Sequence, residues 1–486
     1  MHFIEPENRR QASLFTSLDD FVESDNPVRL LDLIVERIVQ ANPKRFYRRG
    51  LSNIGRKAYS PQVLLKLYLY GYLHGISSSR KLEAETKRNM ELMWLLGRLS
   101  PDHKTISDYR KDHGDTIHFL TLRFAEFLID EKYIIGSDVA LDGTKLKANA
   151  ARQKFMRTKS LERRIKAIEN QLGEYLDQLK RNDIREEAED EDEGTGDLTT
   201  ALIDKVCELE EELQQLRTER NLLEECKLKE LHRTDPDCRQ MKSGHEFIPA
   251  YNLQMVTEMT FGLIVHTEIR QEPGDHGLTE EIIDNLEMET SIVPENLYAD
   301  TAYFSKEQLH WLEIDRGITS WVPVPILKWE RRDKEAGIKF TYDPNSDTYQ
   351  CSQGRILHRK QVNRPQQAVY YRGKSCAGCS LKSKCTQAEN RSIKVPFLQQ
   401  WLDQFRKRMK SFEGVKAMKK RKAWVEHPFG TLKSWMGKNP LNLRGKSNVQ
   451  TEIDLYTIAY NFKRLIGIDY NKQITNKIKS YNWMAP

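Results

Sequence analysis

The sequence predicts an α/β protein built on a mixed five-stranded sheet with flanking helices. Three observations predict this fold. Capped, helix-like segments fill the first 130 residues, heptad-spaced apolar residues fill 152–232, and strand-like runs lie on both sides of the heptad segment. The sheet domain is therefore expected to follow an all-helical region, and a helical hairpin and a small cysteine-containing segment are expected to interrupt it.

Residues 1–130 have the pattern of short helices joined by capped turns. Ser60 followed by Pro61 is typical of an N-cap and a first helical residue, and an apolar run follows them. Basic residues occur along these helices. The pattern fits a helix-turn-helix-like DNA reader, and it fits equally a helical domain that serves only for packing.

Residues 131–151 begin the sheet domain with the run I-I-G-S-D-V-A-L, and residues 233–325 continue it. Residues 247–272 read as a β-hairpin with its turn near 257–262. Further strands are expected at 295–299 and 318–325. With the first strand, these give five.

Residues 152–232 carry two heptad-patterned segments, separated by the acidic stretch 186–196. The simplest structure is an antiparallel helical hairpin inserted after the first strand, with a disordered acidic loop. An intermolecular coiled coil is the alternative. The apolar positions of the two segments are Leu161, Ile165, Ile168, Leu172, Tyr175 and Leu179, then Val206, Leu209, Leu213, Leu216 and Leu223.

Residues 326–396 form the cysteine-containing insertion. Cys351, Cys376, Cys379 and Cys385 have the spacing C-x24-C-x2-C-x5-C, and four thiolates can close a tetrahedral structural Zn²⁺ site. A loop cluster of reduced thiols is the other interpretation. The remaining three of the seven cysteines lie apart from this group, so the composition does not indicate a disulfide scaffold.

Residues 397–486 form the C-terminal part of the sheet domain and contain a basic helix. The segment 406–446 holds 13 Lys and Arg against 2 Asp and Glu, a local charge of +11 in a chain whose net charge is +6. Such a segment favours contact with a polyanion over a merely solvated helix face. The apolar helix expected at 454–465 would pack back on the sheet.

Three carboxylates sit at informative places. Asp142 follows the first strand in D-G-T-K, Asp300 follows another in A-D-T-A-Y, and Glu426 lies in the basic helix within V-E-H-P-F-G-T-L-K. Taken singly, an aspartate after a strand is most often a turn residue or an N-cap. Together they form a hard-oxygen set that suits Mg²⁺ or Mn²⁺. Two such ions, roughly 3.5–4 Å apart, can catalyse phosphodiester chemistry.

These three blocks, in this order and rough spacing, resemble the catalytic blocks of DDE transposases from bacterial insertion sequences. The resemblance spans nearly the whole chain. It implies an RNase H-like catalytic core made of 131–151, 233–325 and 397–486, with residues 1–130 recognising transposon ends. It also implies Mg²⁺- or Mn²⁺-dependent cleavage and strand transfer at terminal inverted repeats by Asp142, Asp300 and Glu426, and a homodimer bound to double-stranded DNA.

The glutamate block departs from the usual family signature Y-x2-R-x3-E-x6-K. Glu426 and Lys433 fit it, whereas Lys419 and Lys422 occupy the tyrosine and arginine positions, and Arg421 is one place off. The expected DNA-contacting residues are Lys419, Lys420, Arg421, Lys422 and Lys433.

Two other functions stay open: an RNase H-like nuclease without strand transfer, and a non-enzymatic DNA-binding or coiled-coil scaffold. No apolar run approaches the length of a membrane span, and the N-terminus lacks a signal-peptide pattern. The expected location is the cytoplasm, in association with the nucleoid.

Overall fold

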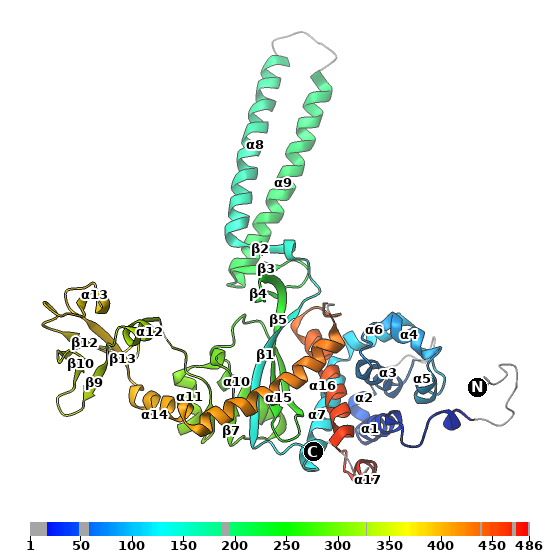
Figure 1. The fold of residues 1–486 in the computed structure, drawn as a ribbon. Helices are drawn as coiled ribbons and strands as arrows, with labels where there is room; N and C mark the ends of the chain where they lie inside the picture. Colours follow the sequence, from blue (N-terminus) through cyan, green and yellow to red (C-terminus); the bar gives the residue numbers. More distant parts are fainter. Residues whose placement is uncertain are drawn as a thin grey trace, which may run out of the picture.

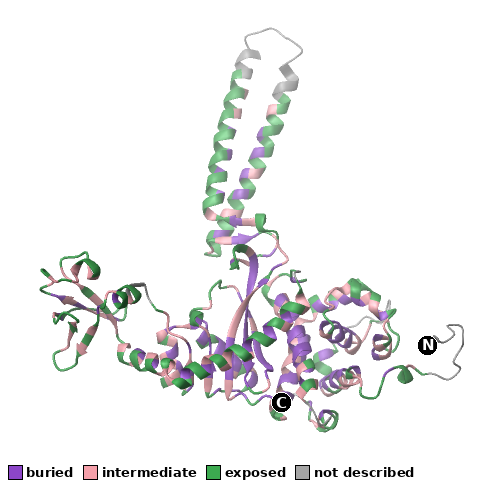
Figure 2. Cartoon of the chain, viewed as in Figure 1, coloured by how far each residue is buried: buried purple, intermediate pink, exposed green. Residues whose placement is uncertain are grey.

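The computed structural model of the 486-residue chain describes residues 17–47, 58–186, 195–326, 328–437, 440–468 and 473–484. Three extensions project from a central sheet: a long helical hairpin, a small β-rich module, and the N-terminal helices (Figure 1). Most buried residues lie in the central sheet and in the helices that cover it (Figure 2).

The N-terminal region is helical, as the sequence predicts. Ser60 caps its helix by accepting a hydrogen bond from the Val63 amide, and Pro61 is the first helical residue. Asp102 caps another helix in the same manner. The elements are η1 (Leu18–Phe21), α1 (Pro27–Ala41), α2 (Pro43–Phe46), α3 (Pro61–Leu73), α4 (Ser79–Thr86), α5 (Met90–Leu95), α6 (His103–Asp112) and α7 (Gly114–Asp130).

The central sheet has six strands in the described part of the chain. Five of them, in the order β6-β5-β1-β7-β8, form the expected mixed sheet. β5 is antiparallel to β1 and to β6, while β7 and β8 run parallel to β1. This order is consistent with an RNase H-like core. The strands are β1 (Asp138–Lys147), β4 (Arg239–Ser243), β5 (Glu246–Glu258), β6 (Ile264–Arg270), β7 (Asn296–Tyr298) and β8 (Thr319–Trp321).

Two features of the sheet differ from the expectation. β4 is an additional strand, which pairs with the first half of β5 on the same edge that β6 uses further along. β1 continues past Asp142 to Lys147, so Asp142 lies inside a strand rather than at its end. The register pairs Asp142 with Met255 of β5.

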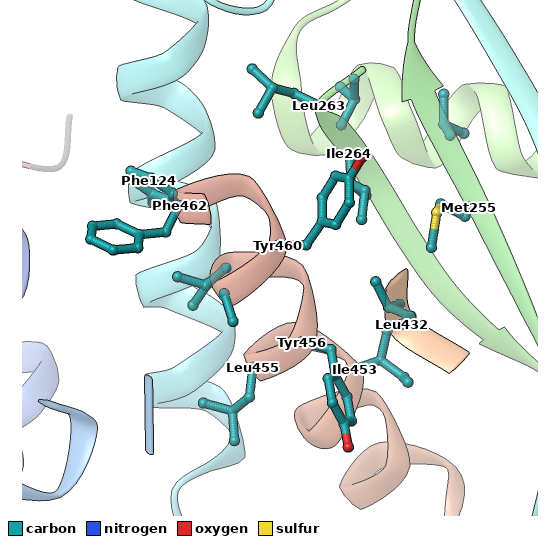
Figure 3. Packing of buried hydrophobic residues seen from close by; sticks show 14 of the residues in the cluster. Phe124, Met255, Leu263, Ile264, Leu432, Ile453, Leu455, Tyr456, Tyr460 and Phe462 are labelled. Carbon is teal, nitrogen blue, oxygen red and sulfur yellow. The ribbon is translucent and has the colours of Figure 1, made fainter. Parts of the chain in front are cut away.

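Helix α16 (Lys446–Ile468) closes the open edge of the sheet. Asn461 accepts a hydrogen bond from the Ile264 amide and donates one to the Ile264 carbonyl. Gln450 likewise accepts a hydrogen bond from the Ile269 amide and donates one to the Thr267 carbonyl, both on β6. These bonds satisfy backbone groups that an edge strand leaves unpaired. Tyr456, Tyr460 and Phe462 of α16 belong to the main hydrophobic core (Figure 3).

Helix α15 (Phe412–Met436) crosses the sheet over β1 (Figure 1). Its buried side chains include Val425, Phe429 and Leu432, and Leu432 lies near Met255 of β5 (Figure 3). Pro428 lies within the helix, where it has no amide to donate to the preceding turn. The other helices around the core are α10 (Thr279–Thr290), η3 (Thr301–Tyr303), α11 (Lys306–Ile314), α14 (Gln399–Lys410) and α17 (Ile474–Ser480).

The hairpin consists of α8 (Thr158–Glu186) and α9 (Thr195–Glu225), which pack side by side above the short pair β2 (Phe155–Arg157) and β3 (Glu230–His232). All the apolar heptad positions predicted from the sequence belong to its own hydrophobic cluster, separate from the main core. Residues 187–194 of the predicted acidic loop lie outside the described residues.

The cysteine-containing segment folds into a five-stranded antiparallel sheet, in the order β13-β12-β11-β10-β9. Its elements are α12 (Lys328–Glu335), β9 (Phe340–Asp343), β10 (Thr348–Cys351), β11 (Ile356–Asn363), β12 (Ala368–Gly373), α13 (Lys382–Cys385) and β13 (Ser392–Pro396). Outside this segment, the short helix η2 (Arg152–Lys154) lies between β1 and β2.

Candidate active site

Asp142 lies within β1, and Asp300 lies two residues after the end of the adjacent parallel strand β7. Ala140 of β1 pairs with Tyr298 of β7, and each aspartate lies two residues further along its chain. Residues two apart along extended backbone point to the same face. The sheet therefore presents both carboxylates on one face, which is the face that α15 covers.

Asp300 also serves as an N-cap, which was the alternative interpretation of this residue. Its Oδ1 accepts a 2.8 Å hydrogen bond from the Ala302 amide at the start of η3. The bond fixes one carboxylate oxygen and leaves the other available. The capping role and a role in metal binding are compatible, because a carboxylate has two oxygens.

The side chain of Asp142 is 23% exposed, and its pKa is raised above the ordinary value. Burial raises its pKa, and the nearby carboxylates of Asp300 and Asp275 raise it further. The guanidinium of Arg421 and the amide of Gly143 oppose this rise in pKa. The energetic cost of keeping Asp142 ionised marks it as a candidate functional group.

The α15 residue that contacts Asp142 is Arg421. Its Nη2 lies 3.0 Å from Oδ2 of Asp142. Glu426 follows five residues later, about 140° further round the helix. Its side chain is 68% exposed and forms a 3.8 Å ion pair with Lys422 on the same helix.

The arrangement brings two of the three predicted metal ligands to one face of the sheet, and metal binding by them stays a prediction. Asp142 and Asp300 supply hard oxygen ligands on one face, which fit Mg²⁺ or Mn²⁺. Glu426 does not join them: within the described residues, no group of three or more His, Cys, Asp or Glu side chains is arranged to hold a metal ion. Two of the three predicted ligands come together.

The predicted DNA-contacting residues of α15 fall into two sets. Lys420 pairs with Asp138 and lies over the ring of Tyr298, and Arg421 pairs with Asp142. These two cations form ion pairs with carboxylates of β1. The exposed side chains are Lys419, Lys422 and Lys433. Glu426 and Lys433 both lie on the exposed side of α15, as their seven-residue spacing predicts.

The four cysteines of the β-rich module are free thiols of intermediate exposure. The thiols of Cys376 and Cys379 lie near Cys385, whose pKa is raised first by burial. With Cys351, they do not form a set arranged to hold a metal among the described side chains. Zinc binding by these four cysteines stays a prediction.

Sequence reasoning missed a group of residues on the other face of β1. Asp275, Gln254 and Tyr303 crowd against Gly143, the residue after Asp142. The only sequence sign of Asp275 is a turn, P-G-D-H-G, after a strand. Gln254 and Tyr303 are brought there by strand pairing and by the η3 turn, which spacing alone does not reveal.

A mixed sheet with two aspartates on the face beneath a basic helix is compatible with the class of enzymes that process nucleic acid with the help of divalent metal. Two segments of the chain match family models. Residues 16–112 match the family described as "Transposase domain (DUF772)", and residues 350–466 match "Transposase DDE domain". The chain thus contains two segments that match transposase domains, one of them a transposase DDE domain, and DDE transposases use divalent metal.

No curated protein matches the chain. Among solved structures, the piggyBac transposase synaptic complex with hairpin DNA overlaps with a TM-score of 0.25 at 9% identity, over 95% of this chain and 85% of that one. At this similarity, nothing about the chain follows from the overlap. In the described residues, no helix is both long enough and apolar enough to cross a membrane.

Proposed function

We propose that this transposase cuts DNA at the terminal inverted repeats of an insertion sequence and joins the freed ends to target DNA. Asp142 and Asp300 hold the divalent metal, and Glu426 completes the set. The observation that carries the proposal is the pairing of β1 with the parallel strand β7, which brings Asp142 of β1 and Asp300, two residues after β7, to one face of the sheet. The proposed location is the cytoplasm, in association with the nucleoid.

Mg²⁺ or Mn²⁺, when bound, would activate the attacking oxygen and stabilise the leaving one. The chain's own residues prepare the site. The Ala302 amide fixes one oxygen of Asp300, and the Gly143 amide fixes one oxygen of Asp142. Arg421 balances the charge of Asp142 at 3.0 Å. Glu426 is close to this site along α15 but faces solvent, so its entry requires a change in α15 or in its side chain.

The exposed lysines of α15 would hold the DNA backbone. Lys419, Lys422 and Lys433 lie on the helix that carries Glu426. Phosphate contacts of this kind position a duplex without reading its sequence. The N-terminal helices, which match the transposase domain at 16–112, would recognise the ends. We propose that two copies of the chain act together as a homodimer on DNA.

The test combines the purified chain, Mg²⁺, a linear DNA that carries the terminal repeats flanking the gene, and a supercoiled target plasmid. The expected product is repeat DNA joined covalently to the plasmid, with no product in EDTA. Cleavage without joining would favour a nuclease without strand transfer. Binding without cleavage would favour a non-enzymatic scaffold. Asp177→Asn, an exposed change on α8, is the matched control and should behave as wild type.

A further inference from the structure

Gly143 is confined by its surroundings and not by its backbone conformation. A Cβ atom there would lie 2.6 Å from Nε2 of Gln254, 3.0 Å from Oδ1 of Asp275 and 3.0 Å from the hydroxyl of Tyr303. Its φ is not positive. A glycine is therefore needed because three polar side chains press on β1 directly behind Asp142, on the face opposite to its carboxylate.

Asp275 is the centre of this group. Its Oδ1 accepts hydrogen bonds from Lys145 Nζ at 3.1 Å, Asn252 Nδ2 at 2.8 Å and Gln254 Nε2 at 2.9 Å. Its side chain is 19% exposed. Three donors on one oxygen are more than a turn residue needs, and Asn252 and Gln254 are both fully buried. The loop that carries Asp275 is thereby tied to β1 and β5.

Tyr303 connects the same group to Asp300. It lies three residues after Asp300 in η3, is fully buried, and donates its hydroxyl hydrogen to Oε1 of Gln254. Burial raises the pKa of Tyr303 first, and the carboxylates of Asp275, Asp142 and Asp300 add to the rise. The hydroxyl therefore stays protonated and remains a donor.

The contacts form one continuous path between the two aspartates. From Asp300 the path follows η3 to Tyr303, crosses to the amide of Gln254 and then to Asp275. From Asp275 it returns through Lys145 to β1, three residues after Asp142. The D-G-T-K and A-D-T-A-Y motifs thus supply Gly143, Lys145 and Tyr303 as well as the two aspartates.

We propose that Asp275, Gln254 and Tyr303 are positioning residues that fix the separation of Asp142 and Asp300 from behind the sheet. The proposal rests on the proposed metal role of the two aspartates. Groups that orient metal ligands typically change metal affinity by 10–100-fold when they are mutated. Two ligands must face one ion at a defined spacing. Removing a hydrogen bond of this path should therefore weaken metal binding more than it lowers the stability of the fold.

The test measures Mn²⁺ binding to the full-length, DNA-free protein by the loss of the free-ion EPR signal, alongside the melting temperature. Asp275→Asn and Tyr303→Phe should each weaken Mn²⁺ binding by roughly tenfold. Gly143→Ala should weaken it as well, and Tyr303→Phe keeps the proposal testable if Gly143→Ala does not fold. Asp177→Asn and Tyr370→Phe are the matched controls, because Asp177 lies in the helical hairpin and Tyr370 in the β-rich module, both outside the central sheet. Asp142→Asn should abolish binding.

The outcomes separate the two proposals. Wild-type Mn²⁺ affinity in Asp275→Asn and Tyr303→Phe, with binding lost in Asp142→Asn, would overturn the positioning role and leave the proposed function intact. Weakened binding in the network variants, with no strand transfer by the wild-type protein, would support the positioning role and end the proposed function. Absence of Mn²⁺ binding in the wild type would overturn both.

Discussion

Arg421 shows how a single residue can differ from its family position and still lie at the site. The sequence places it one residue from the arginine of the usual signature, which leaves its role open. In the structure it is the nearest cation to Asp142. Its position on α15 and the burial of Val425, Phe429 and Leu432 turn it toward the sheet, while Glu426 faces solvent.

Arg421→Ala should make the protein less stable without metal and more responsive to metal. The pair is partly buried, at 16% and 23% exposure, so its loss should cost about 2 kcal/mol in EDTA. A cation beside a metal ligand opposes metal binding, and a ligand that binds only the folded state raises its stability. Mn²⁺ should therefore raise the melting temperature of Arg421→Ala more than that of wild type.

Lys205→Ala is the control for this comparison, because its pair with Glu208 on α9 is exposed, worth little and remote from the proposed metal ligands. An equal or smaller Mn²⁺ effect in Arg421→Ala would contradict the account of Arg421 as a counter-ion of the site.

The salt dependence of DNA binding separates the four neighbouring cations of α15. Replacing Lys419 and Lys422 together by Ala should lower the slope of log K against log[salt] by roughly 1.8 on duplex DNA, about 0.9 per phosphate contact. Replacing Lys420 and Arg421 should change the slope little, because both pair with aspartates of β1. Equal slope changes for the two pairs would show that those ion pairs open on DNA.

At the scale of elements, local patterns predicted the structure well and cross-strand pairing was harder to foresee. The heptads of α8 and α9 repeat over many residues, so their packing followed from the sequence. β4, of sequence R-Q-M-K-S, has a single apolar residue, so its pairing with β5 could not be read from alternation. β1 extends past Asp142 because β5 pairs with it as far as Lys147.

A buried histidine joins β6 to α10 and should make stability depend on pH. Burial alone would lower the pKa of His266, but the ion pairs with Glu268 and Glu289 outweigh it and raise the pKa to about 9. His118 and Arg270 also lie in this cluster. The stability that charged His266 provides is fully present below its unfolded value near 6.5, and it is lost as the pH rises through about 9.

The free energy of unfolding, measured in urea at pH 6, 7.5 and 9, should fall with rising pH in wild type. His266→Gln should flatten this fall. His358→Gln, an exposed change on β11, should leave it unchanged. A wild-type profile that is parallel to that of His266→Gln over this range would show that folding does not shift the pKa of His266.

For the whole molecule, the sequence singles out three candidate carboxylates but does not show how the folded chain arranges them. Asp142 and Asp300 come together because Ala140 of β1 pairs with Tyr298 of the parallel strand β7, and each aspartate lies two residues further along its chain. Glu426 is on the predicted helix, yet its orientation depends on how α15 packs, which the heptad-free sequence of α15 does not specify. Asp275 and Gln254 depend on contacts between segments far apart in the chain, and these are visible only after folding.

The central claim is that Asp142 and Asp300 act as the metal-binding carboxylates of a DNA-joining enzyme. The most direct measurement is Mg²⁺-dependent cleavage of terminal-repeat DNA by Asp142→Asn and Asp300→Asn, with DNA binding measured on the same samples and Asp177→Asn as control. An amide keeps the shape of the side chain but lacks the charge that a divalent ion requires. Cleavage should be lost in both variants while DNA binding and the activity of Asp177→Asn are retained; cleavage at the wild-type rate in either variant would show that this aspartate is not a metal ligand.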